Sequence, residues 1–212
     1  MYSYVLFDFD GTVFDTVEGI SKSVLYALNK QGIDAPLEAL RCFAGPPLGW
    51  SFMDKFGFDE QQATKAVADY RERYIPIGLY ECSIFPGIQE LIRKLRESGV
   101  KLGIATLKPQ HMAETLLKKE DMLCLFDVCC GADPGVMHET KANILSRALK
   151  ELGADISASI YVGDTRFDVE GAHQCGLKCI GVSYGYAAEG ELSKAGADYI
   201  AADAAELEKL LK

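Results

Sequence analysis

The stretch Tyr4-Val5-Leu6-Phe7-Asp8-Phe9-Asp10-Gly11-Thr12-Val13 decides both the fold and the site of this chain. Its first half is apolar and β-prone and ends at a turn signal, which predicts a short buried strand. Asp8 follows that strand and Asp10 lies two residues later, so a nearly extended backbone directs both carboxylates to the same side. Gly11 then lets the chain turn sharply. The two acids repel each other, and a metal ion or a phosphoryl group would explain why they lie side by side.

The composition limits the classes of partner. The chain has 212 residues, of which 49% are hydrophobic, and a formal net charge of −9. An acidic surface argues against nucleic acids and anionic membranes as partners. No apolar run approaches the length of a membrane span. An anionic substrate would therefore need a local positive site.

Cysteine usage indicates the compartment. The seven cysteines include the neighbours Cys129 and Cys130 but form no CxxC pair. This pattern favours buried reduced thiols in a cytoplasmic protein over a disulfide framework or a zinc site. An acid as early as Asp8 does not fit a signal peptide. The three histidines match no metal-ligand spacing. We expect a monomer or a weak homodimer.

The pattern of apolar residues changes along the chain. Residues 15–81 show helical spacing and no strand pattern, with expected helices over 17–32, 49–57 and 60–74 and a loop signal over 41–48. From residue 82 onward, strands alternate with helices, which is typical of an α/β protein with a parallel sheet. The expected strands there cover residues 101–106, 125–130, 159–164, 178–182 and 199–200.

Polar residues stand at the ends of these expected strands. Asp8 and Asp10 follow the first strand, Thr106 ends another, and Asp164 ends a third. In open parallel sheets, sites form at the carboxyl ends of the strands. The sequence therefore predicts one site at this edge of the sheet.

The motifs resemble those of the haloacid dehalogenase-like hydrolase superfamily. Asp8-Phe9-Asp10-Gly11-Thr12, Thr106, Lys141 and Gly163-Asp164-Thr165-Arg166-Phe167-Asp168 match its four motifs in order. The resemblance implies a Rossmann-like core of residues 1–14 and 82–212, and an all-helical cap of residues 15–81. Within the superfamily, the chain looks most like phosphoglycolate phosphatases. Its 43–48 loop and its 182–197 tail look like a bacterial 5′-nucleotidase-like branch.

The resemblance also implies the chemistry. Asp8 is the expected nucleophile, which attacks phosphorus and forms an aspartyl-phosphate that water then hydrolyses. Asp10 is the expected general acid and base. Lys141 is expected to hold Asp8 and the phosphate. We also expect the phosphate to be bound by Thr106, Leu107, Gly11 and Thr12. The backbone N–H of Leu107 is one of the expected donors. A different role for Thr106, capping the next helix, remains compatible.

The predicted cluster of acids requires a cation. At an effective dielectric of about 20, two like charges about 4 Å apart repel by roughly 4 kcal/mol. Hard oxygen ligands beside a phosphate favour Mg²⁺. By resemblance, Asp8 and Asp164 ligate it by side chain and Asp10 by its backbone carbonyl. Asp168 either ligates through water, orients the other ligands, or is a plain helix N-terminal acid.

Other residues have weaker assignments. Arg41, Phe43, Gly45 and Pro46 are expected to shape substrate contacts in the cap. Lys108 and Arg166 are expected to be rim or surface charges. His138 is expected at the surface, and the 135–140 stretch departs from the loop that precedes the motif lysine in relatives.

Other activities known in the superfamily fit this sequence less well. Asp10 argues against a dehalogenase, and the cap lysines show no apolar pocket that would suit a phosphonatase. Gly45-Pro46-Pro47-Leu48 stands where sugar phosphomutases usually carry an arginine. A phosphatase acting on a small soluble phosphate ester remains, with phosphoglycolate phosphatase and 5′-nucleotidase as alternatives. A phospho-accepting receiver or an inactive binding module is the non-enzymatic alternative.

Overall fold

The strand predicted from the opening stretch lies at the centre of a parallel sheet. The computed structural model describes residues 2–133 and 139–212. Strand β1 (Tyr4–Phe7) pairs in parallel with β4 (Lys101–Pro109) on one side and with β6 (Ser159–Gly163) on the other. Val5, Leu6 and Phe7 are fully buried, as expected for a central strand covered on both faces.

The sheet has six strands in the order β5-β4-β1-β6-β7-β8. The outer strands are β5 (Val128–Ala132), β7 (Lys178–Val182) and β8 (Tyr199–Ala201), and every pairing is parallel. Phe7 is in register with Ile104 and Val162, so the residues that follow β1, β4 and β6 come out at one edge. The predicted α/β class with a Rossmann-like parallel sheet is confirmed.

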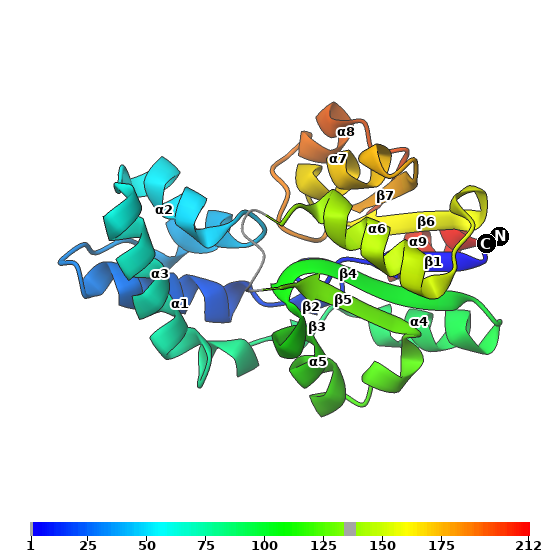
Figure 1. Cartoon of the computed structure of the whole chain (residues 1–212), viewed down its shortest axis with the longest axis horizontal. Coiled ribbons are helices and arrows are strands. Elements are labelled where there is room, and N and C mark those ends of the chain that lie inside the picture. Colours follow the sequence, from blue (N-terminus) through cyan, green and yellow to red (C-terminus); the bar gives the residue numbers. More distant parts are fainter. Residues whose placement is uncertain (1, 134–138) are drawn as a thin grey trace. The chain divides into compact units, whose positions relative to one another are not determined.

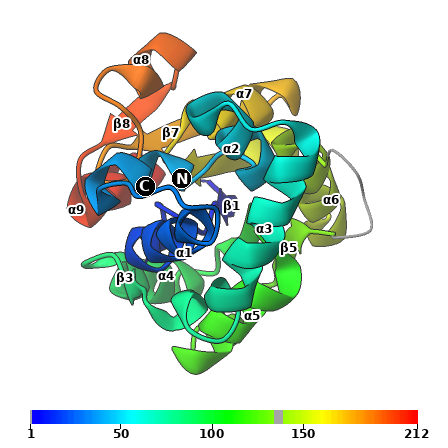
Figure 2. The ribbon, with the colours of Figure 1, turned by 90° about the vertical axis from the view of Figure 1, so that its left-hand side faces the viewer.

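Helices cover both faces of this sheet. Figures 1 and 2 show α6 (Lys141–Leu152) and α7 (Arg166–Gln174) on one face, and α4 (Ile88–Glu97) and α5 (Gln110–Lys119) on the other. The apolar face of α4 is buried, as its helical spacing requires. The remaining elements are α8 (Glu191–Ala195), α9 (Ala204–Leu211), η3 (Leu123–Leu125) and η4 (Ile156–Ala158).

The chain divides into two compact units. The core unit comprises Met1–Phe14 and Ile84–Lys212, and the helical unit comprises Asp15–Ser83. The helical unit contains α1 (Val17–Asn29), η1 (Leu37–Phe43), α2 (Leu48–Phe56), α3 (Glu60–Tyr74) and η2 (Gly78–Tyr80). The short strands β2 (Phe14–Asp15) and β3 (Ser83–Ile84) form a separate two-stranded sheet where the chain passes between the units.

Some local predictions differ from the structure. The 41–48 stretch is not simply a loop, because η1 extends to Phe43 and α2 begins at Leu48. Strand β4 continues past Thr106 to Pro109, and β5 begins three residues later than the apolar run from Leu125 suggested.

Candidate active site

Five predicted site residues come together at the carboxyl edge of the sheet. Asp8 follows β1, Thr106 lies in β4, and Asp164 follows β6, while Lys141 and Asp168 belong to the first turns of α6 and α7. All five side chains are buried, and Asp168 has no exposed surface at all. The carboxyl ends of three strands and the N-termini of two helices therefore bring these five side chains together.

Lys141 joins two of the carboxylates. Its Nζ lies 2.8 Å from Asp8 Oδ1 and 2.8 Å from Asp168 Oδ1. The alkyl stem passes close to α7, where a Cβ at Gly171 would lie only 2.7 Å from Lys141 Cγ. Two flanking carboxylates outweigh the cost of burying the ammonium and raise the pKa of Lys141. The lysine is therefore a fixed cation beside the predicted nucleophile.

Tyr161 is a buried residue of the site that the sequence reasoning missed. Its hydroxyl donates to the Ala105 carbonyl at 2.7 Å and accepts from Lys141 Nζ at 3.2 Å. Burial raises the pKa of this phenol, so it stays protonated. The only sequence signal was a hydroxyl-bearing aromatic in an otherwise apolar strand. Tyr161 links the position of Lys141 to the strand that carries Thr106.

Asp168 contacts both Lys141 and the turn that follows β6. Its Oδ2 accepts from the amides of Asp164 and Thr165, at 3.1 and 2.9 Å, and from the Thr165 hydroxyl at 2.9 Å. Its Oδ1 faces Lys141. Burial opposes its charge, yet Lys141 and these donors hold the pKa of Asp168 below its usual value. Asp168 is therefore an acid at the N-terminus of α7, and its other oxygen forms an ion pair with Lys141.

Asp164 is held against the turn that follows Asp10. The Thr12 hydroxyl lies 3.4 Å from Asp164 Oδ1. Gly11 adopts a φ of +80°, and a Cβ there would overlap the Asp164 carboxylate. Glycine at position 11 is thus required both by its backbone conformation and by the space that Asp164 occupies. Predicted phosphate-binding residues Gly11 and Thr12 therefore contact a predicted metal ligand.

The charges of this cluster do not balance. Asp8, Asp164 and Asp168 offer oxygen atoms that all lie within 4.8 Å of one another. Burial, which Lys141 only partly offsets, raises the pKa of Asp8 to about 7 and holds that of Asp164 well above its usual range. Asp8 Oδ1 is buried and pairs with the Lys141 ammonium at 2.8 Å. Excess negative charge and three converging carboxylates fit a hard divalent cation such as Mg²⁺.

Lys108 corrects one of the predictions. We expected a rim or surface charge, but its side chain is only 3% exposed and its Nζ lies 2.9 Å from Asp10 Oδ1. The ammonium also lies 5.5 Å from the centre of the Phe9 ring. Position 108 is buried because β4 continues beyond Thr106 and so brings Lys108 to Asp10, in the turn that follows β1. The site therefore holds a second buried lysine.

Thr106 does not cap the following helix. Its Oγ1 accepts from the Lys108 amide at 3.2 Å, and α5 begins at Gln110 after Pro109 with no side-chain capping bond. The pairing of β4 with β5 is irregular between Thr106 and Pro109, and Leu107 lies within this stretch. Irregular strand pairing of this kind often changes the direction of side chains beside active sites. The hydroxyl of Thr106 also lowers the pKa of Asp8, although burial dominates there.

The predicted substrate residues of the cap lie in the helical unit. Arg41 is exposed on η1, whereas Phe43 is only 2% exposed and packs edge-on against Phe52, with ring centres 4.9 Å apart. Gly45 and Pro46 are partly exposed, and Gly45 has a φ of +109°. The structure thus accounts for Phe43 as a packing residue of the helical unit.

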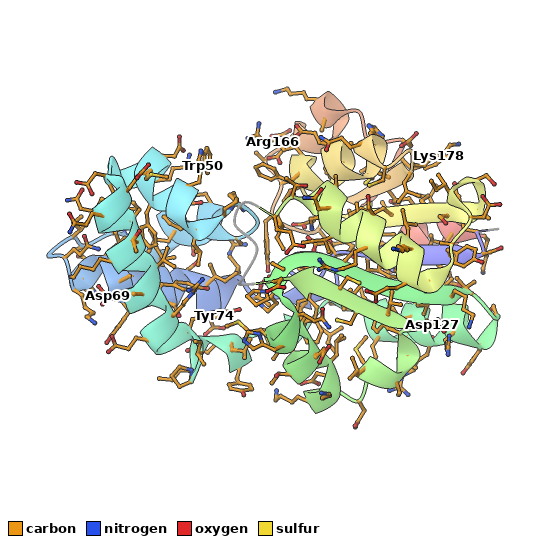
Figure 3. All side chains as sticks on the ribbon, viewed as in Figure 1. Trp50, Asp69, Tyr74, Asp127, Arg166 and Lys178 are labelled. Carbon is orange, nitrogen blue, oxygen red and sulfur yellow. The ribbon has the colours of Figure 1, made fainter. Side chains whose placement is uncertain are left out.

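The remaining candidates are exposed or lie outside the described residues. Arg166 is exposed at the start of α7, with its guanidinium 4.8 Å from the centre of the Phe167 ring (Figure 3). His138 lies outside the described residues. All seven cysteines are free, but Cys42 and Cys124 are exposed, so the expectation of buried thiols holds only in part. Among the described residues, no helix combines the length and hydropathy needed to cross a membrane.

Comparison with known proteins assigns the chain to a family. Residues 5–182 match the model of the haloacid dehalogenase-like hydrolases. The chain is 38% identical over 212 residues to a 5′-nucleotidase of Pseudomonas aeruginosa, covering 100% of this chain and 96% of that protein. It is 29% identical over 190 residues to a phosphoglycolate phosphatase of Pseudomonas syringae pv. syringae, covering 86% and 70%.

A solved structure agrees with these sequence matches. A predicted phosphatase from Clostridium acetobutylicum superposes with a TM-score of 0.94 at 39% identity, covering 100% of this chain and 98% of that one. The expectation of a hydrolase with phosphatase relatives is confirmed. The chain belongs to the haloacid dehalogenase-like hydrolase family.

Proposed function

We propose that this protein is a Mg²⁺-dependent phosphomonoesterase that acts on a small organophosphate through an aspartyl-phosphate. One observation carries the proposal: the Lys141 ammonium lies 2.8 Å from Asp8, inside a buried cluster with Asp164 and Asp168. That arrangement pairs a nucleophile with a fixed positive charge and with ligands for a cation. A phosphoryl group needs all three.

The reaction has two displacement steps. Asp8 attacks phosphorus, a bond from its carboxylate oxygen to phosphorus forms, and the bond from phosphorus to the ester oxygen breaks. Asp10 gives its proton to the departing alkoxide, which leaves as the alcohol. Water then attacks the acyl phosphate, gives a proton to Asp10, and releases inorganic phosphate from Asp8. Both carboxyl groups return to their starting forms.

The other residues position the phosphate and offset its charge. Lys141 would bind a phosphoryl oxygen while it holds Asp8, and Thr106, with the Leu107 N–H, would bind a second. Gly11 and Thr12 would supply backbone contacts at the same turn. When bound, Mg²⁺ would offset the charge of the phosphate, held by the side chains of Asp8 and Asp164 and by the carbonyl of Asp10. Because Asp168 pairs with Lys141 and accepts from the Asp164 amide, we assign it to orienting this set.

The helical unit suits the role of a cap that shields the reaction from bulk water, with Arg41, Gly45 and Pro46 as substrate-facing candidates. Phosphoglycolate is the first substrate class to test. A nucleoside 5′-monophosphate is the second, favoured by the 38% identity to a 5′-nucleotidase over the whole chain. A sugar phosphomutase is the less favoured alternative. We further propose a cytoplasmic monomer or weak homodimer, since a reducing compartment suits seven free cysteines.

A phosphomonoester panel with phosphate release as the readout tests the proposal. We expect turnover with MgCl₂, loss of turnover with a chelator, and loss of at least ~10³-fold in kcat for Asp8→Asn. Asp34→Asn, at an exposed position of the helical unit, is the matched control. Acid quenching should trap a phosphorylated peptide that contains Asp8. Wild-type turnover by Asp8→Asn would show that another group is the nucleophile.

A further inference from the structure

The loop Ser183-Tyr184-Gly185-Tyr186, hereafter the 183–186 loop, contacts the site without belonging to any of its motifs. It follows β7, which pairs in parallel with β6, so it leaves the sheet beside Asp164 at the end of β6. Three consecutive residues of the loop each make a different contact with the site. These contacts converge on Asp164 and on the turn that follows Asp10.

Tyr186 and Gly185 define the position of the Asp164 carboxylate. The Tyr186 amide donates to Asp164 Oδ2 at 2.8 Å. A Cβ at Gly185 would overlap Asp164 Cβ and would lie 2.5 Å from Asp164 Oδ2 and 2.5 Å from the Gly11 carbonyl oxygen. The φ of Gly185 is not in the left-handed region, so space and not backbone conformation requires glycine there. The loop backbone lies directly against the carboxylate.

Gly11 encloses the same carboxylate from the other segment. A Cβ at Gly11 would also overlap Asp164 Oδ2. Asp164 is therefore packed between two glycines that come from opposite ends of the core unit's sequence. A carboxylate held this closely, with an amide donor on one oxygen and a hydroxyl near the other, has little freedom to rotate.

Tyr184 holds the turn itself. Its hydroxyl donates to the Thr12 carbonyl at 2.9 Å, and its ring packs on Phe85 with ring centres 4.8 Å apart. The Phe85 amide in turn donates to the Val13 carbonyl at 3.1 Å. Two successive carbonyls of the turn after Asp10 therefore accept hydrogen bonds, one from Tyr184 and one from Phe85, on which the Tyr184 ring packs. The backbone that presents the Asp10 carbonyl is held in place.

We infer that the 183–186 loop is a positioning element that sets Asp164 and the Asp10–Val13 turn in the geometry that binds Mg²⁺. The inference rests on the proposed Mg²⁺-dependent function. Groups that orient metal ligands without touching the metal control affinity strongly, and their loss typically weakens binding by about 10- to 100-fold. The loop therefore acts on cation affinity, with activity following from it.

Isothermal titration of the substrate-free protein with MgCl₂ tests the inference. We expect Gly185→Ala to weaken Mg²⁺ binding by about 10- to 100-fold. Tyr184→Phe, which removes only the bond to the Thr12 carbonyl, should weaken it by a smaller factor of about three to ten. Gly49→Ala is the matched control, because a Cβ at Gly49 in α2 meets nothing within 4 Å. Its Mg²⁺ affinity should equal that of the wild type. Thermal unfolding without Mg²⁺ checks that each variant is folded.

The outcomes separate the inference from the function on which it rests. Failure of the wild type to bind Mg²⁺ would refute the proposed function. If the wild type binds Mg²⁺ and a folded Gly185→Ala binds it with the same affinity, the inference alone is overturned. The same holds if Gly185→Ala loses stability but no affinity for Mg²⁺. Should Gly185→Ala not fold, Tyr184→Phe decides, and an unchanged dissociation constant in that variant would overturn the role of the loop.

Discussion

Lys108 binds both carboxylate oxygens of Asp10, at 2.9 Å to Oδ1 and 3.3 Å to Oδ2, across 98 residues of sequence. The lysine side chain is only 3% exposed and that of Asp10 18% exposed, so the pair is largely removed from water. An ammonium that contacts both oxygens restricts rotation of the carboxylate. Since Asp10 is the proposed proton donor to the leaving oxygen, Lys108 is placed to aim that donor.

The first prediction concerns the leaving group. Lys108→Met should lower kcat for alkyl phosphates, whose leaving oxygens need a proton, by about 10- to 100-fold, a part of the usual effect of acid–base catalysis. Nitrophenyl phosphate, with its good leaving group, should lose less than about fivefold. Lys108→Arg should recover part of the activity because it restores a cation. A series of esters with graded leaving-group basicity measures the difference.

Lys118→Met is the control for this series, since Lys118 is 64% exposed on α5 and pairs only loosely with Glu114. Its kcat should match the wild type for every ester. An equal loss across the whole series in Lys108→Met would show that Lys108 supports the fold or binds the phosphate instead of aiming Asp10.

The centre of the sheet was predictable from sequence because the central strands β1, β4 and β6 are largely buried on both faces. Such strands read as short continuous apolar runs, and the runs around Leu6, Ile104 and Val162 have this form. The carboxyl-edge rule then placed Asp8 and Asp164 at one edge before any contact was known. The irregular end of β4 was not predictable, because its course depends on pairing with β5 and not on local residue type.

The supporting residues of the site were harder to predict, since their roles arise from tertiary contacts. Lys108 reads as a surface lysine until β4 brings it against Asp10. Tyr161 reads as a core aromatic, and it is the contacts with Lys141 and Asp168 that make its hydroxyl part of the site. Gly185 reads as a turn glycine, although the space beside Asp164 is what excludes a larger residue. Sequence shows residue type and spacing, whereas these roles depend on close approach.

The second prediction concerns Tyr161, whose hydroxyl connects Lys141 Nζ with the Ala105 carbonyl. Tyr161→Phe removes the hydroxyl and keeps the ring. We expect a loss of about 1–3 kcal/mol in the free energy of unfolding, because a buried carbonyl loses a donor. Lys141 retains both carboxylates, so kcat should fall by less than about tenfold, with KM nearly unchanged.

Urea unfolding and steady-state kinetics measure these two effects. Tyr199→Phe, in the edge strand β8, is the control, since the Tyr199 hydroxyl is a long 3.4 Å from Lys178, which is exposed (Figure 3). A Tyr161→Phe variant with unchanged stability and turnover would contradict the assigned contacts.

The third prediction concerns acid stability. Asp127 (Figure 3) accepts from the Leu102 amide at 3.0 Å, from Arg96 at 2.7 Å and from Lys101 at 3.0 Å. Burial opposes its charge, but these donors together hold the pKa of Asp127 below its usual value. The stabilisation is therefore complete above the unfolded-state pKa of about 3.9 and is lost as the pH falls through the lower folded-state pKa.

Asp127→Asn should consequently be less stable than the wild type by about 1–3 kcal/mol at neutral pH. The difference should shrink on acidification below about pH 4, since the wild type then loses the same charge. Urea unfolding across this pH range measures it, with exposed Asp34→Asn as the control. A difference that stays constant to the lowest pH would show that the charge of Asp127 contributes nothing.

The fourth prediction separates two residues of one short helix. Phe43 packs against Phe52 in the interior of the helical unit, whereas Arg41, two residues earlier on η1, is exposed. Phe43→Ala should therefore destabilise the helical unit by about 3–5 kcal/mol, the usual cost of truncating a buried phenylalanine. Arg41→Ala should leave the unfolding transition unchanged.

The two variants should also differ in substrate ranking. If Arg41 binds the part of the substrate that lies beyond the phosphate, Arg41→Ala should lower kcat/KM about tenfold for esters with a second anionic group, such as phosphoglycolate. Neutral esters should be nearly unaffected. Phe43→Ala should lower kcat/KM for all esters alike, because a destabilised unit does not distinguish among them. A uniform effect of Arg41→Ala would remove Arg41 from substrate recognition and leave specificity to other residues of the helical unit.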